Sequence, residues 1–188
     1  MADPIEMLER EHRVIEEVLA SLESFLNRLG SEPDRERGVV RDYALFFSDY
    51  VDTCHHGKEE NYLFPKMRAF GFSSEAGPVA AMLSEQGEGR DHLLALASIG
   101  AGEGPLSAAE CNLVRGHGLG YILRIRPHMA REDDILFPMI AHSLPRFIME
   151  EIGRDCVAFD EKELPPGFHE NLRQLHQRLL QSYPPEKR

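Results

Sequence analysis

The sequence predicts an all-α protein: an antiparallel up-down-up-down four-helix bundle followed by a short C-terminal helical extension. Apolar residues recur at spacings of three and four along most of the chain, and alternating strand-like runs are missing. Short connectors rich in glycine and proline separate four long amphipathic segments, which is typical of antiparallel bundles. We expect residues 1–142 to form the bundle and residues 143–188 to pack on its outside, with short helices near residues 147–153 and 168–181.

The first expected helix runs from Pro4 to Gly30. Asp3 before Pro4 is a favoured helix start, because an Asp side chain caps free N–H groups and proline suits the first turn. The apolar positions that follow form one continuous stripe, and His12 falls within it. We therefore expect His12 to face the core.

The second expected helix begins near Pro33 and ends at Pro65, since proline cannot continue a helix interior. Its inward face carries His55 and Glu59. A connector rich in turn residues, 71–78, leads to the third helix.

The third expected helix carries Gln86 on its inward face and ends at a glycine-rich break, residues 100–105. The fourth follows, with His128 and Glu132 on its inward face, and is expected to end at Pro138. Each of the four helices thus places polar residues among its core positions.

Composition narrows the class of partner. The formal net charge is −11, whereas duplex binding requires a cationic surface, so we expect no nucleic-acid partner. No apolar run is long enough to span a membrane, and no basic amphipathic stretch predicts a membrane surface as partner. The N-terminus lacks the pattern of a signal peptide, so a cytoplasmic location is expected. The three widely spaced cysteines predict free thiols.

An internal repeat relates the two halves of the expected bundle. Residues 55–65 align without gaps with residues 128–138, an offset of 73, and Glu11-His12 aligns with residues 85–86 at an offset of 74. The bundle is therefore predicted to consist of two helix pairs of the same design.

Two His-x-x-x-Glu pairs occupy equivalent places in this repeat. They are His55 with Glu59 and His128 with Glu132. Residues four apart stack on one helix face about 6 Å from each other, so both can reach one metal ion. Buried carboxylates without compensating charge cost several kcal/mol, and no Lys or Arg clearly supplies that charge on the core stripes. We predict a dimetal centre, near which His12 also lies; imidazole and carboxylate donors favour iron, with manganese or zinc as alternatives.

These elements resemble the hemerythrin-like (HHE cation-binding) domain family over roughly residues 3–142. The matching segments are Glu11-His12, Cys54-His-His-Gly-Lys-Glu-Glu60 with Leu63-Phe-Pro65, Met82-Leu-x-Glu85 with Gly89-Arg90, and His128-x-x-x-Glu132 with Leu136-Phe-Pro138. The resemblance implies two non-haem iron ions, with or without an oxo or hydroxo bridge. It further implies that Glu59 and Glu132 are bridging carboxylates and that the histidines are terminal ligands.

Position 86 departs from the family pattern, in which Met-Leu-x-Glu is followed by His. Gln86 could ligate through its amide oxygen, which is a weaker donor to iron than imidazole. His92 could replace it, although six residues along a helix amount to about 240° of rotation. A third outcome is that one metal is loosely held or absent. The expected ligands are His12, His55, Glu59, His128 and Glu132, with Gln86 and His92 as alternatives.

Two further histidines receive weaker assignments. His56 points about 100° away from His55 on an α-helix and is expected to flank the site. His117 is expected to be a core histidine with its own hydrogen-bond partner. Pro127, directly before His128, is expected to kink the helix, whether as a tolerated irregularity or as a means of aiming His128.

For function, a module that binds or senses a small ligand is expected rather than an enzyme. The resemblance implies dioxygen, nitric oxide or a peroxide as the ligand. The alternatives are an iron donor or iron-centre repair protein, a peroxide-consuming enzyme, and a bundle that serves as a scaffold after losing its metal. We expect no linked output domain in this sequence, so a signal would pass to a protein partner or through the C-terminal segment.

Overall fold

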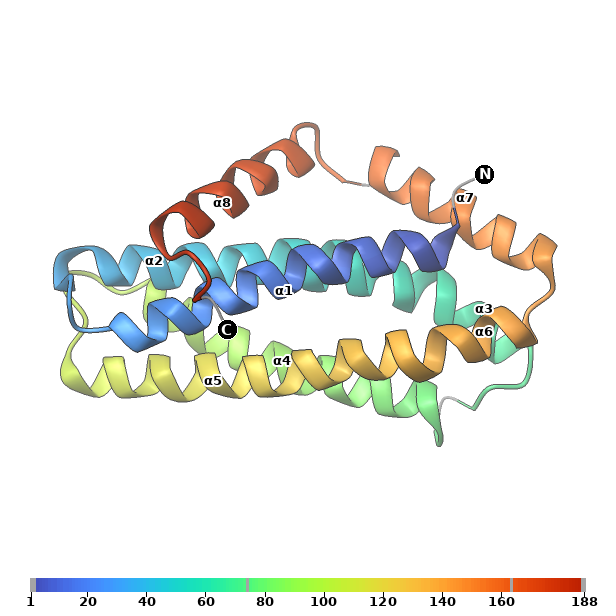
Figure 1. Cartoon of the computed structure of the whole chain (residues 1–188), viewed down its shortest axis with the longest axis horizontal. Coiled ribbons are helices and arrows are strands. Elements are labelled where there is room, and N and C mark those ends of the chain that lie inside the picture. The colour runs from blue at the N-terminus through green and yellow to red at the C-terminus, as the bar shows by residue number, and fades with distance from the viewer. Residues whose placement is uncertain (1–2, 74, 163, 187–188) are drawn as a thin grey trace.

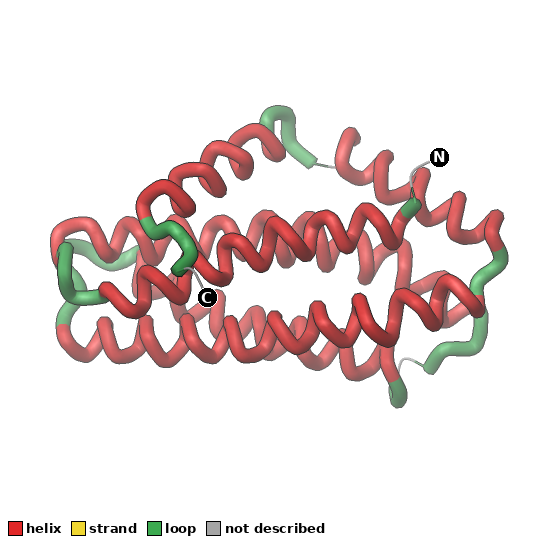
Figure 2. The backbone as a smooth tube through the Cα atoms, viewed as in Figure 1, coloured by secondary structure: helices red, strands yellow, loops and turns green. Residues whose placement is uncertain are grey.

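The computed structural model describes residues 3–73, 75–162 and 164–186, and long helices lying side by side dominate it (Figure 1). In chain order its elements are α1 (Pro4–Arg28), α2 (Pro33–Phe46), η1 (Phe47–His56), η2 (Glu59–Leu63), α3 (Phe64–Ala69), α4 (Pro78–Gly100), α5 (Ala108–Arg131), η3 (Glu132–Leu136), α6 (Phe137–Ser143), α7 (Arg146–Lys162) and α8 (Phe168–Ser182). The three η elements are π-helical. Within the described residues no strand occurs (Figure 2), which confirms the all-helical class.

The start of α1 follows from its first residues. The Asp3 carboxylate accepts a hydrogen bond from the Ile5 N–H at 2.9 Å, and Pro4 occupies the first turn. The helix ends at Arg28, two residues before Gly30, whose φ of 102° suits glycine. The first expected helix is therefore confirmed to within the usual uncertainty of a helix end.

The expected helix ends at Pro65 and Pro138 are wrong. Each proline instead occupies the first turn of a further α-helix, α3 or α6, where a missing N–H is tolerated. A π-helical turn, η2 or η3, ends directly before each of these helices. The helical path therefore continues past both prolines. Pro127 differs from both in lying inside a helix, since α5 runs through it without a break.

The long helices pack in a defined order. α1 packs against α5, α2 against α4, and α4 against α5. Helices α7 and α8 lie along one side of this body, where α7 contacts α1 and α8 contacts both α1 and α2 (Figure 1). No helix among the described parts of the chain is long and apolar enough to cross a membrane.

Helix α7 is longer than the sequence predicts, because the expected stop at Gly153 is wrong. The helix continues to Lys162, and its buried side chains Ile148, Ile152, Cys156 and Phe159 recur at spacings of three and four. This stripe packs against α1 and η2. Tertiary burial thus outweighs the low helix propensity of one glycine.

Two apolar clusters form the core, and a polar layer separates them. One cluster includes Ile15, Val51, Leu93 and Ile125; the other includes Leu8, Leu63, Met82 and Leu136. On α1 the polar layer falls between Leu8 and Ile15, and on α5–η3 it falls between Ile125 and Leu136. All the predicted metal ligands except His92 occupy this layer.

Candidate metal centre

The polar layer contains seven side chains that are almost inaccessible to solvent. They are His12, His55, His56, Glu59, Gln86, His128 and Glu132, and none is more than 4 % exposed. All the predicted ligands except His92 are in this set. Buried polar groups are normally satisfied by partners, so their partners decide what the layer can do.

A first group brings together His12, His55, Glu59 and Glu132, whose ligand atoms all lie within 4.8 Å of one another. The Nε2 atoms of His12 and His55 are 3.0 Å apart. The Oε2 atom of Glu132 lies 3.3 Å from Nε2 of His12, and the Oε1 atom of Glu59 lies 3.7 Å from Nε2 of His55. Four donors from α1, η1, η2 and η3 thus converge on one point.

A second group brings together His56, Glu59 and His128 within the same limit of 4.8 Å. The other carboxylate oxygen of Glu132, Oε1, lies 3.3 Å from Nε2 of His128. Glu59 therefore belongs to both groups, and Glu132 directs one oxygen to each. This is the arrangement that two bridging carboxylates require.

Carboxylates outside the layer orient two of the histidines. The Nδ1 atom of His55 lies 2.9 Å from Oε2 of Glu11, and the Nδ1 atom of His128 lies 2.9 Å from Oε2 of Glu85. Glu11 and Glu85 are equivalent in the internal repeat, so both halves use the same device. Nδ1–H donation to a carboxylate turns the Nε2 lone pair inward, as in many metal-ligating histidines.

The other two histidines follow the same pattern. The Nδ1 atom of His12 lies 2.7 Å from Oδ1 of Asp133, and the Nδ1 atom of His56 lies 3.6 Å from Oδ1 of Asp52. Asp52 is in turn held by Arg90 at 2.6 Å. Three of the four imidazoles are thus hydrogen-bonded to an outer carboxylate, which leaves their Nε2 atoms for the centre, whereas His56 has its carboxylate beyond hydrogen-bond distance.

The inner atoms of the layer are short of partners. If His12 and His55 both donate Nδ1–H outward, two Nε2 lone pairs face each other at 3.0 Å, which only a shared proton or a cation stabilises. The atoms of the layer without a hydrogen-bond partner are Oε1 of Glu59, both oxygens of Glu132, Nε2 of His128, both ring nitrogens of His56 and Oε1 of Gln86. Each unpaired buried group costs about 1–3 kcal/mol.

Charge in the layer is unbalanced in the metal-free protein. Burial raises the pKa of Glu59 well above its usual value, and the neighbouring Glu132 raises it further. Burial acts in the same direction on Glu132, but His128 and His12 outweigh it and hold the pKa of Glu132 below its usual value. Burial lowers the pKa of His55 and of His56. The layer therefore holds two carboxylates that resist being ionised together without added positive charge.

His12 is the exception among the histidines. Burial alone would lower its pKa, but the hydrogen bond to Asp133 and the nearby charge of Glu132 raise the pKa of His12 to about 9. In the metal-free protein, Nε2–H of protonated His12 thus donates a hydrogen bond to Nε2 of His55.

The structure places Gln86 and His92, the two alternative ligands, in different surroundings. Gln86 is fully buried in the layer, and its Nε2 donates to Oε2 of Glu59 at 2.7 Å. His92 lies elsewhere: its Nδ1 is 3.2 Å from Nδ1 of His117, and both rings are only partly buried. His117 does have its own partner, as expected, but it is not a core residue.

His56 lies deeper in the layer than the sequence predicts. The sequence predicts that it flanks the site, whereas its ring lies beside that of His128, with centroids 5.6 Å apart. The reason is local geometry: η1 is π-helical, and a wider i→i+5 helix turns successive side chains through a smaller angle than an α-helix does. His55 and His56 can therefore both reach the layer. Two adjacent histidines in a predicted ligand motif were the available signal.

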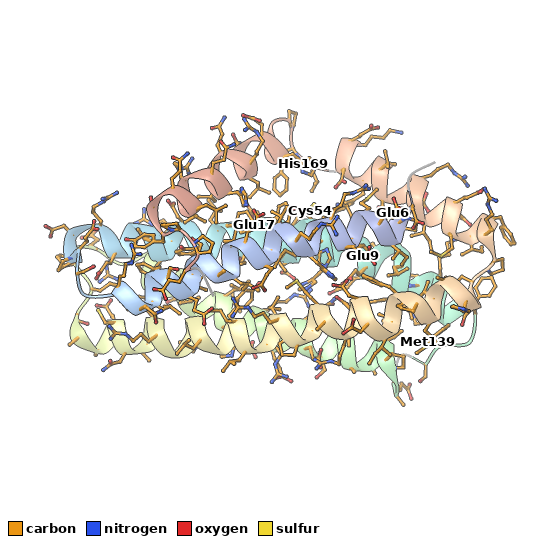
Figure 3. The ribbon with its side chains drawn as sticks, in the orientation of Figure 1. Glu6, Glu9, Glu17, Cys54, Met139 and His169 are labelled. Carbon is orange, nitrogen blue, oxygen red and sulfur yellow. The ribbon has the colours of Figure 1, made fainter. Side chains whose placement is uncertain are left out.

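An open cleft of about 510 Å³ reaches the layer from outside. It lies between α1 and α5–η3, and His12 and Met129 contribute to its lining. Four carboxylates and two arginines also line it: Glu9, Glu16, Asp133 and Asp134, with Arg13 and Arg126. Glu9 is labelled in Figure 3. Solvent and small solutes thus approach the polar layer next to one of its histidines.

Fold and site together define a helical protein with a buried cluster of histidines and glutamates that suits metal cations. The comparison with known families agrees. The model of the hemerythrin HHE cation-binding domain matches residues 3–140, so the chain belongs to this family.

Curated relatives are distant and carry no assigned activity. Two proteins of Mycobacterium tuberculosis, the uncharacterized proteins Rv1995 and MT2051, are each 26 % identical to the chain over 136 residues. The uncharacterized protein Mb2018 of Mycobacterium bovis matches to the same extent. The match covers 72 % of this chain and 52 % of each relative, so the chain spans about half their length. No solved structure matches the chain.

Proposed function

We propose that this chain binds two non-haem iron ions in the polar layer and presents them to dioxygen, nitric oxide or a peroxide. The first ion would be held by His12 and His55, and the second by His56 and His128. Glu59 and Glu132 would bridge them. The observation that carries the proposal is the convergence of unpartnered, buried nitrogen and oxygen atoms on two points.

The donor set fits iron. Imidazole and carboxylate together suit iron, and manganese or zinc would also accept them. Two cations would allow Glu59 and Glu132 to be ionised together and would satisfy the inner atoms that lack partners. His56 supplies the imidazole that position 86 lacks. Gln86, whose amide donates to Glu59, would then orient a bridging carboxylate instead of serving as a ligand.

The protein's own residues prepare the site for a small ligand. A ferrous pair, when bound, supplies electrons and an open coordination position. The apolar clusters on either side exclude bulk water, and outer carboxylates fix the imidazoles of His12, His55 and His128 before binding. The cleft beside His12 would admit a small molecule.

The arrangement of the helices is part of the proposal. We take the long helices as an up-down-up-down four-helix bundle of hemerythrin type. The packing of α1 on α5, of α2 on α4 and of α4 on α5 supports it, as does the internal repeat. Residues 143–188 would be an extension to this bundle.

The test is metal analysis followed by optical spectroscopy of the ferrous protein. Protein produced with iron supplied should contain near two irons per chain, and visible bands should appear on exposure to dioxygen or nitric oxide. A spectrum that neither gas changes would overturn the sensing role, and a chain without bound metal would overturn the site.

Release of iron to an acceptor is a second candidate, and the acidic cleft is the observation that favours it. Its four carboxylates, those of Glu9, Glu16, Asp133 and Asp134, outnumber the two guanidinium groups, those of Arg13 and Arg126, and would attract a cation leaving or reaching His12. Under this reading, iron-loaded protein transfers iron to an apo-cluster acceptor faster than a chelator alone removes it. No transfer under those conditions would exclude it.

A further inference from the structure

A buried lysine connects the metal layer with the C-terminal extension. Lys58 is 0 % exposed, and its ammonium forms an ion pair with Glu11 and a second with Asp160, at 2.9 Å from Oδ1. Its third neighbour is the Sγ atom of Cys54 at 3.3 Å. A buried lysine depends on such partners, because an unpaired charge in the interior is costly by several kcal/mol.

The contacts form a continuous chain from α7 to the layer. Asp160 of α7 holds Lys58; Lys58 holds Oε1 of Glu11; and Oε2 of the same carboxylate accepts from Nδ1 of His55 at 2.9 Å. Each oxygen of Glu11 thus has one partner. If Lys58 shifts, the carboxylate that orients His55 loses one of its two anchors.

The same chain is built differently in the other half of the repeat. Arg131, at the place equivalent to Lys58, pairs with Glu85, which orients His128. Arg131 is 39 % exposed, whereas the Lys58 side chain is 1 % exposed. Asp160 lies outside the residues that match the family, 3–140. Among the described residues, the C-terminal extension therefore contacts the buried ion pair behind His55, whereas the equivalent ion pair behind His128 is partly exposed.

A metal ion in this outer cluster is not the better assignment. Cys54, Asp160 and His169 are close enough to hold one, and Figure 3 labels Cys54 and His169 on the side that α7 and α8 cover. The ammonium of Lys58, however, already lies beside both Asp160 and Cys54. It supplies the positive charge that a metal ion would bring.

We propose that Asp160 is a positioning residue for the metal centre, through which the C-terminal extension fixes His55 by way of Lys58 and Glu11. This rests on the proposed metal site. It follows that the ion on His12 and His55 is held more tightly than the ion on His56 and His128. Changes in carboxylates behind metal-bound histidines typically weaken metal binding by about 10- to 100-fold.

The test uses the full-length variant Asp160→Asn and titration with Co²⁺ alone. The expected result is that the tighter of the two binding steps weakens by up to about tenfold, the lower end of the range for a carboxylate that contacts the histidine directly, while the weaker step is unchanged. The variant Asp160→Glu, which keeps the carboxylate, should recover most of the lost affinity. The control is Glu151→Gln on the same helix. The Glu151 carboxylate forms an ion pair of 2.8 Å with Lys66 and takes no part in the contacts that lead to the layer. This control variant should bind Co²⁺ as the wild type does.

A second readout needs no metal. In wild-type protein from which a chelator has removed all metal, the ring-nitrogen NMR shifts of His55 should report a proton on Nδ1 and none on Nε2. In the variant Asp160→Asn the same shifts should report a mixture of the Nδ1–H and Nε2–H tautomers. An unchanged tautomer together with unchanged Co²⁺ affinity would overturn the proposal, even if the variant is less stable. If the wild type binds no metal, the proposed function fails, and the tautomer in the metal-free protein still decides the role of Asp160.

Discussion

Replacing His56 by leucine separates metal binding from stability, and the two effects should have opposite signs. Both ring nitrogens of His56 are buried without a hydrogen-bond partner. Each such group costs about 1–3 kcal/mol, and leucine fills a similar volume without polar atoms. We therefore expect the metal-free His56→Leu variant to be more stable than the wild type by about 1–3 kcal/mol in urea unfolding.

The same variant should lose one metal ion. Without His56, the second group retains only His128 as imidazole donor, and iron content should fall from near two to near one per chain. A loss of 100-fold or more in affinity at that position corresponds to about 2.8 kcal/mol. Adding Gln86→His to this variant places an imidazole where the family pattern has one, so the second ion should return.

The matched control is His142→Leu, because His142 is an exposed histidine on α6 that contacts the Pro138 carbonyl at 2.9 Å. It should change neither metal content nor stability appreciably. Two ions retained in His56→Leu, or a metal-free variant less stable than the wild type, would refute the reasoning about His56.

Three further predictions concern pH, charge and packing. The pKa of His12 is raised to about 9, so its contribution to the stability of the metal-free protein should be fully present below pH 6.5 and lost as pH rises through about 9. Metal must displace this proton, so the apparent metal affinity should rise by at least about tenfold per pH unit toward pH 9. A flat pH profile would contradict the assignment. Because burial and Glu132 raise the pKa of Glu59, Glu59→Gln should stabilise the metal-free protein at pH 7, as measured by urea unfolding, and should abolish binding of both metal ions. A variant less stable than the wild type at pH 7 would argue against an unfavourable environment for the Glu59 carboxylate. A Cβ at Gly100 would lie 2.9 Å from the Cα atom of Arg41, so Gly100→Ala should lower the free energy of unfolding by about 1–3 kcal/mol. Gly87 lies on the same helix with open space around it, so Gly87→Ala should raise the free energy of unfolding by up to about 1 kcal/mol.

Much of the site could be predicted from the sequence because it rests on α-helical periodicity and on a repeat. His12 lies on the apolar stripe of α1, and the equivalent pairs His55–Glu59 and His128–Glu132 lie in the layer between the two apolar clusters. A buried carboxylate at a core position requires a charge partner, which made the type of site predictable as well.

The remainder depended on features that an α-helical template does not contain. His56 reaches the layer because η1 is π-helical, and the sequence prediction applied an α-helical angle to it. The helical path continues past Pro65 and Pro138 because each proline lies in the first turn of a further helix, which a π-helical turn precedes. The contact between Lys58 and Asp160 joins residues 102 positions apart, and periodicity along one helix carries no information about it.

Anomalous diffraction at the iron edge, on crystals of protein grown with iron, tests the central claim most directly. Two peaks should appear in the polar layer, one beside His12 and His55 and the other beside His56 and His128, with Glu59 and Glu132 between them. A second peak beside Gln86 with His56 unbound would contradict the ligand assignment. No peak in the layer would contradict the metal centre itself.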